Sequence, residues 1–196
     1  MKLLMLSLIV LAAGKSTRMH GRNKLLAKVG GTPMIRRVVI AALQSKVDEV
    51  IVVVGWEADK VRKALAELPC RIVLNKDYAK GQSTSVKAGL RDVGETTQAI
   101  LVLPGDVAMI DFRSINRIVD DYSIRKRLIV IASHKGKLGH PVLLDRQLFN
   151  EIGAINEATY GLKSVIEKYR RKIRLIETGS PNVLTDVDTR EDLRKL

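Results

Sequence analysis

The sequence predicts an α/β protein: a three-layer α/β/α sandwich around a mostly parallel sheet. Two apolar runs, Leu3 to Val10 and Glu49 to Val54, are rich in branched residues and typical of strands buried on both faces. Segments with apolar residues at helical spacing separate such runs, and this alternation is typical of a sheet covered by helices on both sides. We expect one domain over residues 1–196, because this length is sufficient to bury a substantial core.

The expected elements alternate between strand and helix almost to the end of the chain. Thr32 and Pro33 are expected to cap and begin the first helix, whose apolar stripe contains Ile35, Val39 and Leu43. Further strands are predicted at residues 49–54, 71–74, 99–103, 128–133, 139–144 and 173–177. Further helices are predicted at residues 57–68, 81–91, 112–122, 146–152 and 162–170, with a last one capped by Thr189. Loops after successive parallel strands gather at one edge of a sheet, so we expect ligands to bind there.

The segment from Leu11 to Lys24 follows the first strand and is the most informative part of the chain. It reads Leu-Ala-Ala-Gly-Lys-Ser-Thr-Arg-Met-His-Gly-Arg-Asn-Lys and contains small residues, two hydroxyls and four cations. Small residues let backbone N–H groups approach an anion, and cations neutralise the rest of its charge. We therefore expect a polyphosphate site with Arg18 and Lys24 as its working cations, since a guanidinium holds two phosphate oxygens and an ammonium acts as a point charge. Solvated positions are the alternative for Lys15 and Arg22.

Two other phosphate-binding motifs do not fit this segment. Gly14-Lys15-Ser16 resembles the end of a Walker A loop, but Ile9 stands where that loop needs its first glycine. The dinucleotide fingerprint G-x-G-x-x-G is also absent, because Ala12 and Ser16 flank Gly14. The sequence therefore argues against a Walker-type NTPase and against a nicotinamide or flavin enzyme.

Three carboxylates in the later part of the chain are candidate metal ligands. Asp106 ends Leu-Pro-Gly-Asp after an apolar strand, and Mg²⁺ prefers one or two carboxylate oxygens together with phosphate oxygens. Asp186 and Asp188 point the same way if their stretch is extended, so one of them could complete the site. A turn carboxylate is the structural alternative for Asp106, and a helix cap is the alternative for Asp188.

The segment from Ile9 to Pro33 resembles a known signature almost continuously. It matches L-A-[AG]-G-x-[SG]-x-R-M followed by a lysine, and it ends in Lys-Leu-Leu-Ala-Lys-Val-Gly-Gly-Thr-Pro. The chain therefore resembles the small nucleotidyltransferase family that includes molybdenum cofactor cytidylyltransferase and its guanylyl counterpart. The resemblance implies a Rossmann-like sheet of the glycosyltransferase-A-like type and transfer of a nucleotide from an NTP to an acceptor.

The resemblance also implies which residues bind the nucleotide. Gly81-Gln-Ser-Thr-Ser85 begins a helix after Asn75 and is implied to read the base, although hydroxyls at helix starts commonly serve as caps. Ala13, where guanylyl relatives tend to have glycine, favours a cytosine base. The full set of predicted nucleotide-binding residues is Leu11, Ala12, Ala13, Gly14, Lys15, Ser16, Asn75, Gly81, Ser83 and Ser85.

The same resemblance assigns the metal side and the acceptor side. The Gly-Asp at Asp106 is implied to bind Mg²⁺. The stretch that contains Asp186 and Asp188 is similar to the family's D-[IV]-D-T-x-E-D, and its two carboxylates favour the cytidylyl branch. The G-H-P-V turn at His140 and the helix start at Lys163 are similar to acceptor-side segments, so both residues are expected beside the acceptor. We expect His140 to have a structural rather than a catalytic role there.

The expected reaction transfers CMP from CTP to a small phosphorylated acceptor and releases pyrophosphate. A molybdopterin-type cofactor is the preferred acceptor by resemblance. A sugar- or polyol-phosphate cytidylyltransferase and a guanylyl-type relative are the alternatives within this class. The acceptor's phosphate oxygen is already ionised, so no general base is required, and catalysis is expected to come from positioning and from charge neutralisation by Mg²⁺, Lys24 and Arg18.

Composition sets the remaining expectations. The formal net charge of +13 attracts polyanions, so a basic nucleic-acid-binding protein that retains the fold is the alternative of another class. Aromatic residues are only 4% of the chain, which leaves few surfaces for base stacking, so no nucleic-acid partner is expected. A single cysteine and the lack of any run of eighteen apolar residues predict a cytoplasmic protein without a membrane span. The apolar start of the chain is not expected to be a signal peptide.

Overall fold

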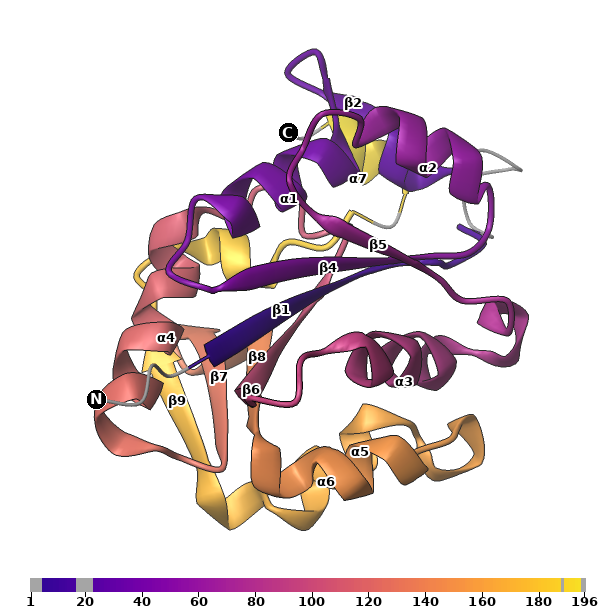
Figure 1. Ribbon diagram of the computed structural model, residues 1–196. Helices are drawn as coiled ribbons and strands as arrows, with labels where there is room; N and C mark the ends of the chain where they lie inside the picture. Colours follow the sequence, from indigo (N-terminus) through magenta and orange to yellow (C-terminus); the bar gives the residue numbers. More distant parts are fainter. Residues whose placement is uncertain (1–4, 17–22, 188, 195–196) are drawn as a thin grey trace.

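The computed structural model describes residues 5–16, 23–187 and 189–194 of the chain. Its centre is a seven-stranded sheet in the order β5-β4-β1-β6-β8-β7-β9 (Figure 1). The strands are β1 (Met5–Ala12), β4 (Glu49–Val54), β5 (Arg71–Leu74), β6 (Thr97–Pro104), β7 (Ile129–His134), β8 (Lys137–Asp145) and β9 (Ile173–Glu177). Neighbouring strands are parallel except on the two sides of β8, so the predicted mostly parallel sheet is confirmed.

Helices cover both faces of this sheet, which confirms the predicted three layers (Figure 1). The helices that pack on one face are α1 (Met34–Leu43), α2 (Ala58–Ala64) and α4 (Phe112–Arg125). Those on the other face are α3 (Gln82–Asp92), α5 (Phe149–Ala154) and α6 (Leu162–Lys168), and α7 (Arg190–Arg194) comes last in the chain. None of the helices in the described part of the chain has both the length and the apolar character needed to cross a bilayer.

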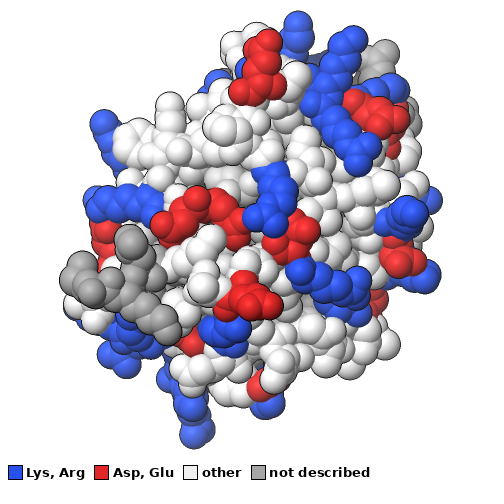
Figure 2. Space-filling model, in the orientation of Figure 1, with Lys and Arg blue, Asp and Glu red and all other residues white. Residues whose placement is uncertain are grey.

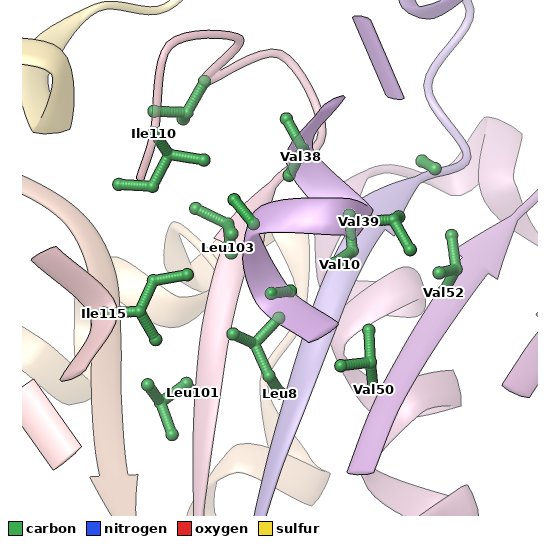
Figure 3. Packing of buried hydrophobic residues seen from close by; sticks show 14 of the residues in the cluster. Leu8, Val10, Val38, Val39, Val50, Val52, Leu101, Leu103, Ile110 and Ile115 are labelled. Atoms are coloured by element: carbon green, nitrogen blue, oxygen red, sulfur yellow. The ribbon is translucent and has the colours of Figure 1, made fainter. Parts of the chain in front are cut away.

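Side-chain alternation along the central strands forms two separate cores. Leu8 and Val10 of β1 belong to the same cluster as Val38 and Val39 of α1 (Figure 3). Ile9, which lies between them in the sequence, belongs to the cluster beneath α3, α5 and α6. Because successive strand side chains point to opposite faces, an uninterrupted apolar run requires cover on both sides. This is the physical reason why the apolar runs in the sequence predict central strands.

The start of α1 differs from the prediction. Thr32 and Pro33 form strand β3, which pairs with β2 (Lys28–Val29), and Pro33 is the N-cap residue of the helix rather than its first residue. The turn between these two strands contains two glycines with φ of 56° and 81°, a conformation that lets the chain reverse within two residues. The helix then begins at Met34 without a side-chain cap. The predicted cap, Thr32, therefore lies one residue before the actual N-cap position, and the N–H of Met34 donates to the carbonyl of Ala27 over 2.9 Å.

Strand β8 runs against its neighbours because it follows β7 through a tight turn. Lys135 and Gly136 have φ of 50° and 75°, as two-residue hairpin turns require. Val142 pairs with Val102 of β6 in the antiparallel register. The start of β8, including His140, therefore lies beside the carboxyl end of β6.

Gly89 allows α3 to pack closely on β1, because a Cβ at this position would lie 2.5 Å from Cγ2 of Ile9. We expect Gly89→Ala to lower the free energy of unfolding by about 1–3 kcal/mol, since the added methyl overpacks this contact. Gly153→Ala in α5 is the matched control, because nothing lies within 4 Å of its Cβ position, and it is expected to be neutral or stabilising. Urea unfolding of the three proteins measures the effect. Equal stability of Gly89→Ala and the wild type would contradict the close approach.

Candidate functional site

A cavity of about 820 Å³ opens at the carboxyl edge of the parallel strands. Its wall is formed by residues that follow β1 and β6, by the segment between β5 and α3, and by α6. The lining residues are Leu11, Ala13, Gly14, Lys15, Ser16, Lys24, Leu25, Tyr78, Ala79, Gly81, Gln82, Ser85, Pro104, Asp106 and Lys163. Open α/β sheets bind ligands at this edge, and the volume is that of a small-molecule site.

The carboxyl ends of β1, β4 and β6 lie close enough for direct backbone bonds in the loops that follow them. The N–H of Gly105 donates to the carbonyl of Leu11 over 2.9 Å, and the N–H of Trp56 donates to the carbonyl of Ala13 over 3.1 Å. Gly105 has no room for a side chain, because a Cβ there would lie 2.9 Å from the Leu11 oxygen and 3.0 Å from Cδ1 of Ile35. Small residues therefore hold the turn after β1 against the end of β6.

The basic segment brings an ammonium group to Asp106. The N–H of Lys24 donates to Oγ of Ser16 over 3.2 Å, and Ser16 itself has a left-handed backbone with φ of 51°. Nζ of Lys24 lies 2.6 Å from Oδ2 of Asp106, and the two side chains are only 16% and 19% exposed. Water therefore screens this ion pair less than a surface pair. Lys15 adds a second cation to the lining, with Nζ 5.9 Å from the centre of the Tyr78 ring.

Asp106, His140 and Asp186 gather at one place beside the cavity. The N–H of Val187 donates to the backbone carbonyl of Asp106 over 3.1 Å, which brings the preceding Asp186 close. Burial lowers the pKa of His140, while the carboxylates of Asp186 and Asp106 act in the opposite direction. Within the described ranges, Oδ1 of Asp106 and Nδ1 of His140 are buried without a hydrogen-bond partner.

These residues fit a divalent cation that is shared with a phosphate ligand. Oδ1 of Asp106 is a buried carboxylate oxygen with no partner among the described residues, and Asp106 lines the cavity. Mg²⁺ keeps several ligand positions for phosphate oxygens and water and commonly takes only one or two carboxylates from the protein. The part of the chain that the structure describes contains no group of three or more metal-binding side chains that would hold an ion alone. Asp188 lies outside the described residues.

Asn75 holds the segment that leads into α3. Its side-chain nitrogen donates to Oγ1 of Thr84 over 2.8 Å and to Oγ of Ser85 over 3.0 Å. Its Oδ1 accepts the backbone N–H of Asp77 over 2.9 Å. The residue is only 5% exposed and is not part of the cavity lining. Asn75 therefore shapes the cavity wall through internal bonds, whereas its sequence context predicts a contact with the nucleotide.

The cavity brings together ten of the predicted site residues. These are Leu11, Ala13, Gly14, Lys15, Ser16, Lys24, Gly81, Ser85, Asp106 and Lys163. The described residues that were predicted for the site and do not line the cavity are Ala12, Asn75, Ser83, His140 and Asp186. Ala12 and Ser83 are buried, at 1% and 3% exposure. Arg18 lies outside the described residues, as Asp188 does.

Five of the lining residues are not among the predicted site residues: Leu25, Tyr78, Ala79, Gln82 and Pro104. Leu25, Gln82 and Pro104 stand within motifs that the sequence shows, although no role is predicted for them individually. Tyr78 and Ala79 lie in the connection from β5 to α3 and carry no charge or motif that marks them. Only their position in the chain could have identified them, because a connection that leaves the carboxyl end of a parallel strand begins at the edge of the sheet where ligands bind.

The family model of the MobA-like NTP transferase domain matches residues 8–173 of the chain. The chain belongs to this family. It is therefore a nucleotidyltransferase domain, the class that the sequence predicts. The matched range contains every lining residue of the cavity, whereas Asp186 and Asp188 follow it.

Relatives of this MobA-like domain occur as parts of longer proteins and as chains of similar size. The bifunctional protein GlmU of Desulfotalea psychrophila is 27% identical over 149 residues, which cover 76% of this chain and 43% of that protein. The chain thus spans less than half the length of this curated relative. The structure of Rv0371c from Mycobacterium tuberculosis H37Rv has a TM-score of 0.88 at 26% identity and covers 100% of this chain and 98% of its own. A complex of Rv0371c with manganese has a TM-score of 0.82 at 26% identity, covering 98% and 97%.

The bonds of Asn75 predict a stability effect. We expect Asn75→Ala to lower the free energy of unfolding by about 1–3 kcal/mol, because the buried Ser85 hydroxyl and the Asp77 N–H lose this partner. Asn150→Ala, at an exposed position of α5, is the control and is expected to leave stability unchanged. Urea unfolding measures both variants. The assigned role of Asn75 is wrong if the two variants are equally stable.

Proposed function

We propose that this domain transfers a nucleotidyl group from a nucleoside triphosphate to a small phosphorylated acceptor and releases pyrophosphate. The observation that carries the proposal is the single cavity shared by the turn after β1, Lys24 and Asp106. A small-residue turn, an ammonium group and an adjacent carboxylate suit a polyphosphate together with its divalent cation. CTP is the proposed donor, and a molybdopterin-type cofactor is the proposed acceptor.

Two residues support CTP as the donor. Ala13 lines the cavity and stands where guanylyl relatives tend to have glycine. Asp186 belongs to the pair of carboxylates that resembles the cytidylyl branch, and it lies near Asp106. A guanylyl-type enzyme and a sugar- or polyol-phosphate cytidylyltransferase are the alternatives. Activity measured with different NTP donors and different phosphorylated acceptors distinguishes them.

In the proposed reaction, an ionised phosphate oxygen of the acceptor attacks the α-phosphorus of the NTP. A new P–O bond forms to this oxygen, and the bond to the bridging oxygen of pyrophosphate breaks. No side chain has to remove a proton, because the nucleophile is already deprotonated at neutral pH. Lys24 and Arg18 are proposed to neutralise the charge of the triphosphate, and Lys163, which enters the cavity from α6, is proposed to hold the acceptor phosphate.

Asp106 is the proposed holder of Mg²⁺, with Asp186 or Asp188 as a second carboxylate. The buried and unpaired Oδ1 of Asp106, in the described part of the chain, supports this assignment. The ion pair with Lys24 through the other oxygen orients the carboxylate. When bound, a divalent cation neutralises negative charge on the phosphate oxygens. The manganese complex of Rv0371c supports divalent-metal binding by this fold.

We expect Asp106→Ala to abolish metal-dependent pyrophosphate release, because the cation loses its carboxylate. Lys24→Ala is expected to lower turnover by about 10²–10³, comparable to the loss of one preorganised donor. The measurement is pyrophosphate release from CTP across candidate phosphorylated acceptors, with Mg²⁺ and with Mn²⁺.

Matched controls come from an exposed ion pair on the same molecule. Nζ of Lys46 lies 2.7 Å from Oδ1 of Asp120, and the side chains are 58% and 51% exposed. Such surface pairs contribute little to stability, so Lys46→Ala and Asp120→Ala should retain full activity. Near-normal turnover of Asp106→Ala would refute its proposed role.

A second experiment separates this function from nucleic-acid binding. On the face shown in Figure 2, Lys and Arg side chains are interspersed with Asp and Glu, whereas a nucleic-acid interface has a continuous basic surface. We expect CTP with Mg²⁺ to raise the unfolding temperature more than the other NTPs do, since a ligand at about 100 times its Kd adds about 2.7 kcal/mol of stability. RNA at physiological salt should have no effect. Salt-sensitive binding of RNA without a response to any NTP would favour the alternative.

A further inference from the structure

One contact links the α3 side of the cavity to the α6 side. Glu157 begins a 3-10 turn, Glu157–Thr159, between α5 and α6, and its Oε1 accepts the backbone N–H of Ser83 over 2.6 Å. Ser83 is the second residue of α3 and is 74 positions away in the sequence. The preceding residue, Gln82, lines the cavity. The bond therefore ties a distant loop to the helix start that forms part of the cavity wall.

The loop that carries Glu157 is held by bonds of its own. The side chain and the carbonyl of Asn156 accept backbone N–H groups of this loop over 3.1 Å and 2.8 Å. A Cβ at Gly161 would lie 3.7 Å from Cβ of Ser83, so the loop backbone also packs on α3. Lys163, two residues farther along, lines the cavity. One short, internally bonded turn thus contacts the α3 wall and positions the lysine of the α6 wall.

Gly81 leaves the space that Glu157 occupies. Its φ is 111°, a conformation that residues with a side chain rarely adopt, and a Cβ there would overlap the Glu157 side chain. The charge of Glu157 also suits its position, because a carboxylate at a helix N-terminus interacts favourably with the helix dipole and accepts a charge-assisted bond. The N–H of Thr84 donates a hydrogen bond to the carbonyl of Gly81 over 3.3 Å. In the described part of the chain, the N–H of Gln82 has no acceptor.

We propose that Glu157 is a positioning residue that fixes the Gly81–Gln82 backbone in the cavity wall and thereby sets discrimination among nucleobases. The inference rests on the proposed nucleotidyl transfer, in which the base lies against this wall. When the backbone groups of the wall are fixed, a mismatched base is left with unpaired polar atoms. The free-energy cost of these unpaired atoms is what discriminates between bases. Without the Glu157 bond, the Gly81–Gln82 backbone loses one of its restraints and can shift, so matched and mismatched bases bind with more similar affinities.

The test measures binding of CTP, GTP, UTP, ATP and inorganic pyrophosphate by calorimetry with Mg²⁺. Glu157→Ala should weaken binding of the preferred NTP and reduce its preference over the other NTPs by about tenfold, the equivalent of one lost hydrogen bond. Its affinity for pyrophosphate, which has no base, should stay unchanged. Glu157→Gln should recover most of the preference, because an amide oxygen still accepts the Ser83 N–H.

Glu167→Ala is the matched control, because it removes another carboxylate from the same region. Glu167 is 74% exposed and pairs only with Arg170, at 3.3 Å, among the described residues, so its loss should change none of the affinities. Urea unfolding checks that each variant is folded. If Glu157→Ala keeps the same preference among the four NTPs as the wild type, the inference is overturned and the proposed function still stands. An equal loss of NTP and pyrophosphate affinity would overturn it as well. A wild-type protein that binds no NTP would overturn both.

Discussion

The close approach of the carboxyl ends of β1 and β6 is the constraint on which the site depends. The backbone bond from Gly105 to Leu11 is possible only because position 105 has no side chain. This contact places the basic turn after β1 next to the carboxylate after β6, so that Lys24 and Asp106 form an ion pair. A larger residue at position 105 would push the two strand ends apart and so separate the two charges.

The Lys24–Asp106 pair is poorly suited to a purely structural role. Both side chains are less than one fifth exposed, and desolvation of two charges offsets much of their attraction. One oxygen of Asp106 is buried without a hydrogen bond from any described residue, which adds a further unfavourable term. Stability alone therefore does not explain the arrangement, whereas a site that receives phosphate and a cation does.

Local patterns predicted the sheet and the position of the small-residue turn after β1, because strand burial and turn composition depend on neighbours along the chain. They were less informative about individual polar groups. Asn75 has the right chemistry for base recognition, but its amide is used by Asp77, Thr84 and Ser85. Tyr78 has no motif around it and still lines the cavity. The type of a residue limits which hydrogen bonds its side chain can form, but tertiary packing determines which partners lie within reach.

The amino-acid sequence by itself determined the α/β class, the nucleotidyltransferase family and the edge at which a ligand is expected. Strand periodicity and a nearly continuous motif are local properties, so they can be recognised without coordinates. The tertiary structure decided that Lys24 meets Asp106, that His140 lies near Asp186, and that Glu157 reaches α3. These contacts join residues far apart in the chain, and the order and register of the strands between them set their distances.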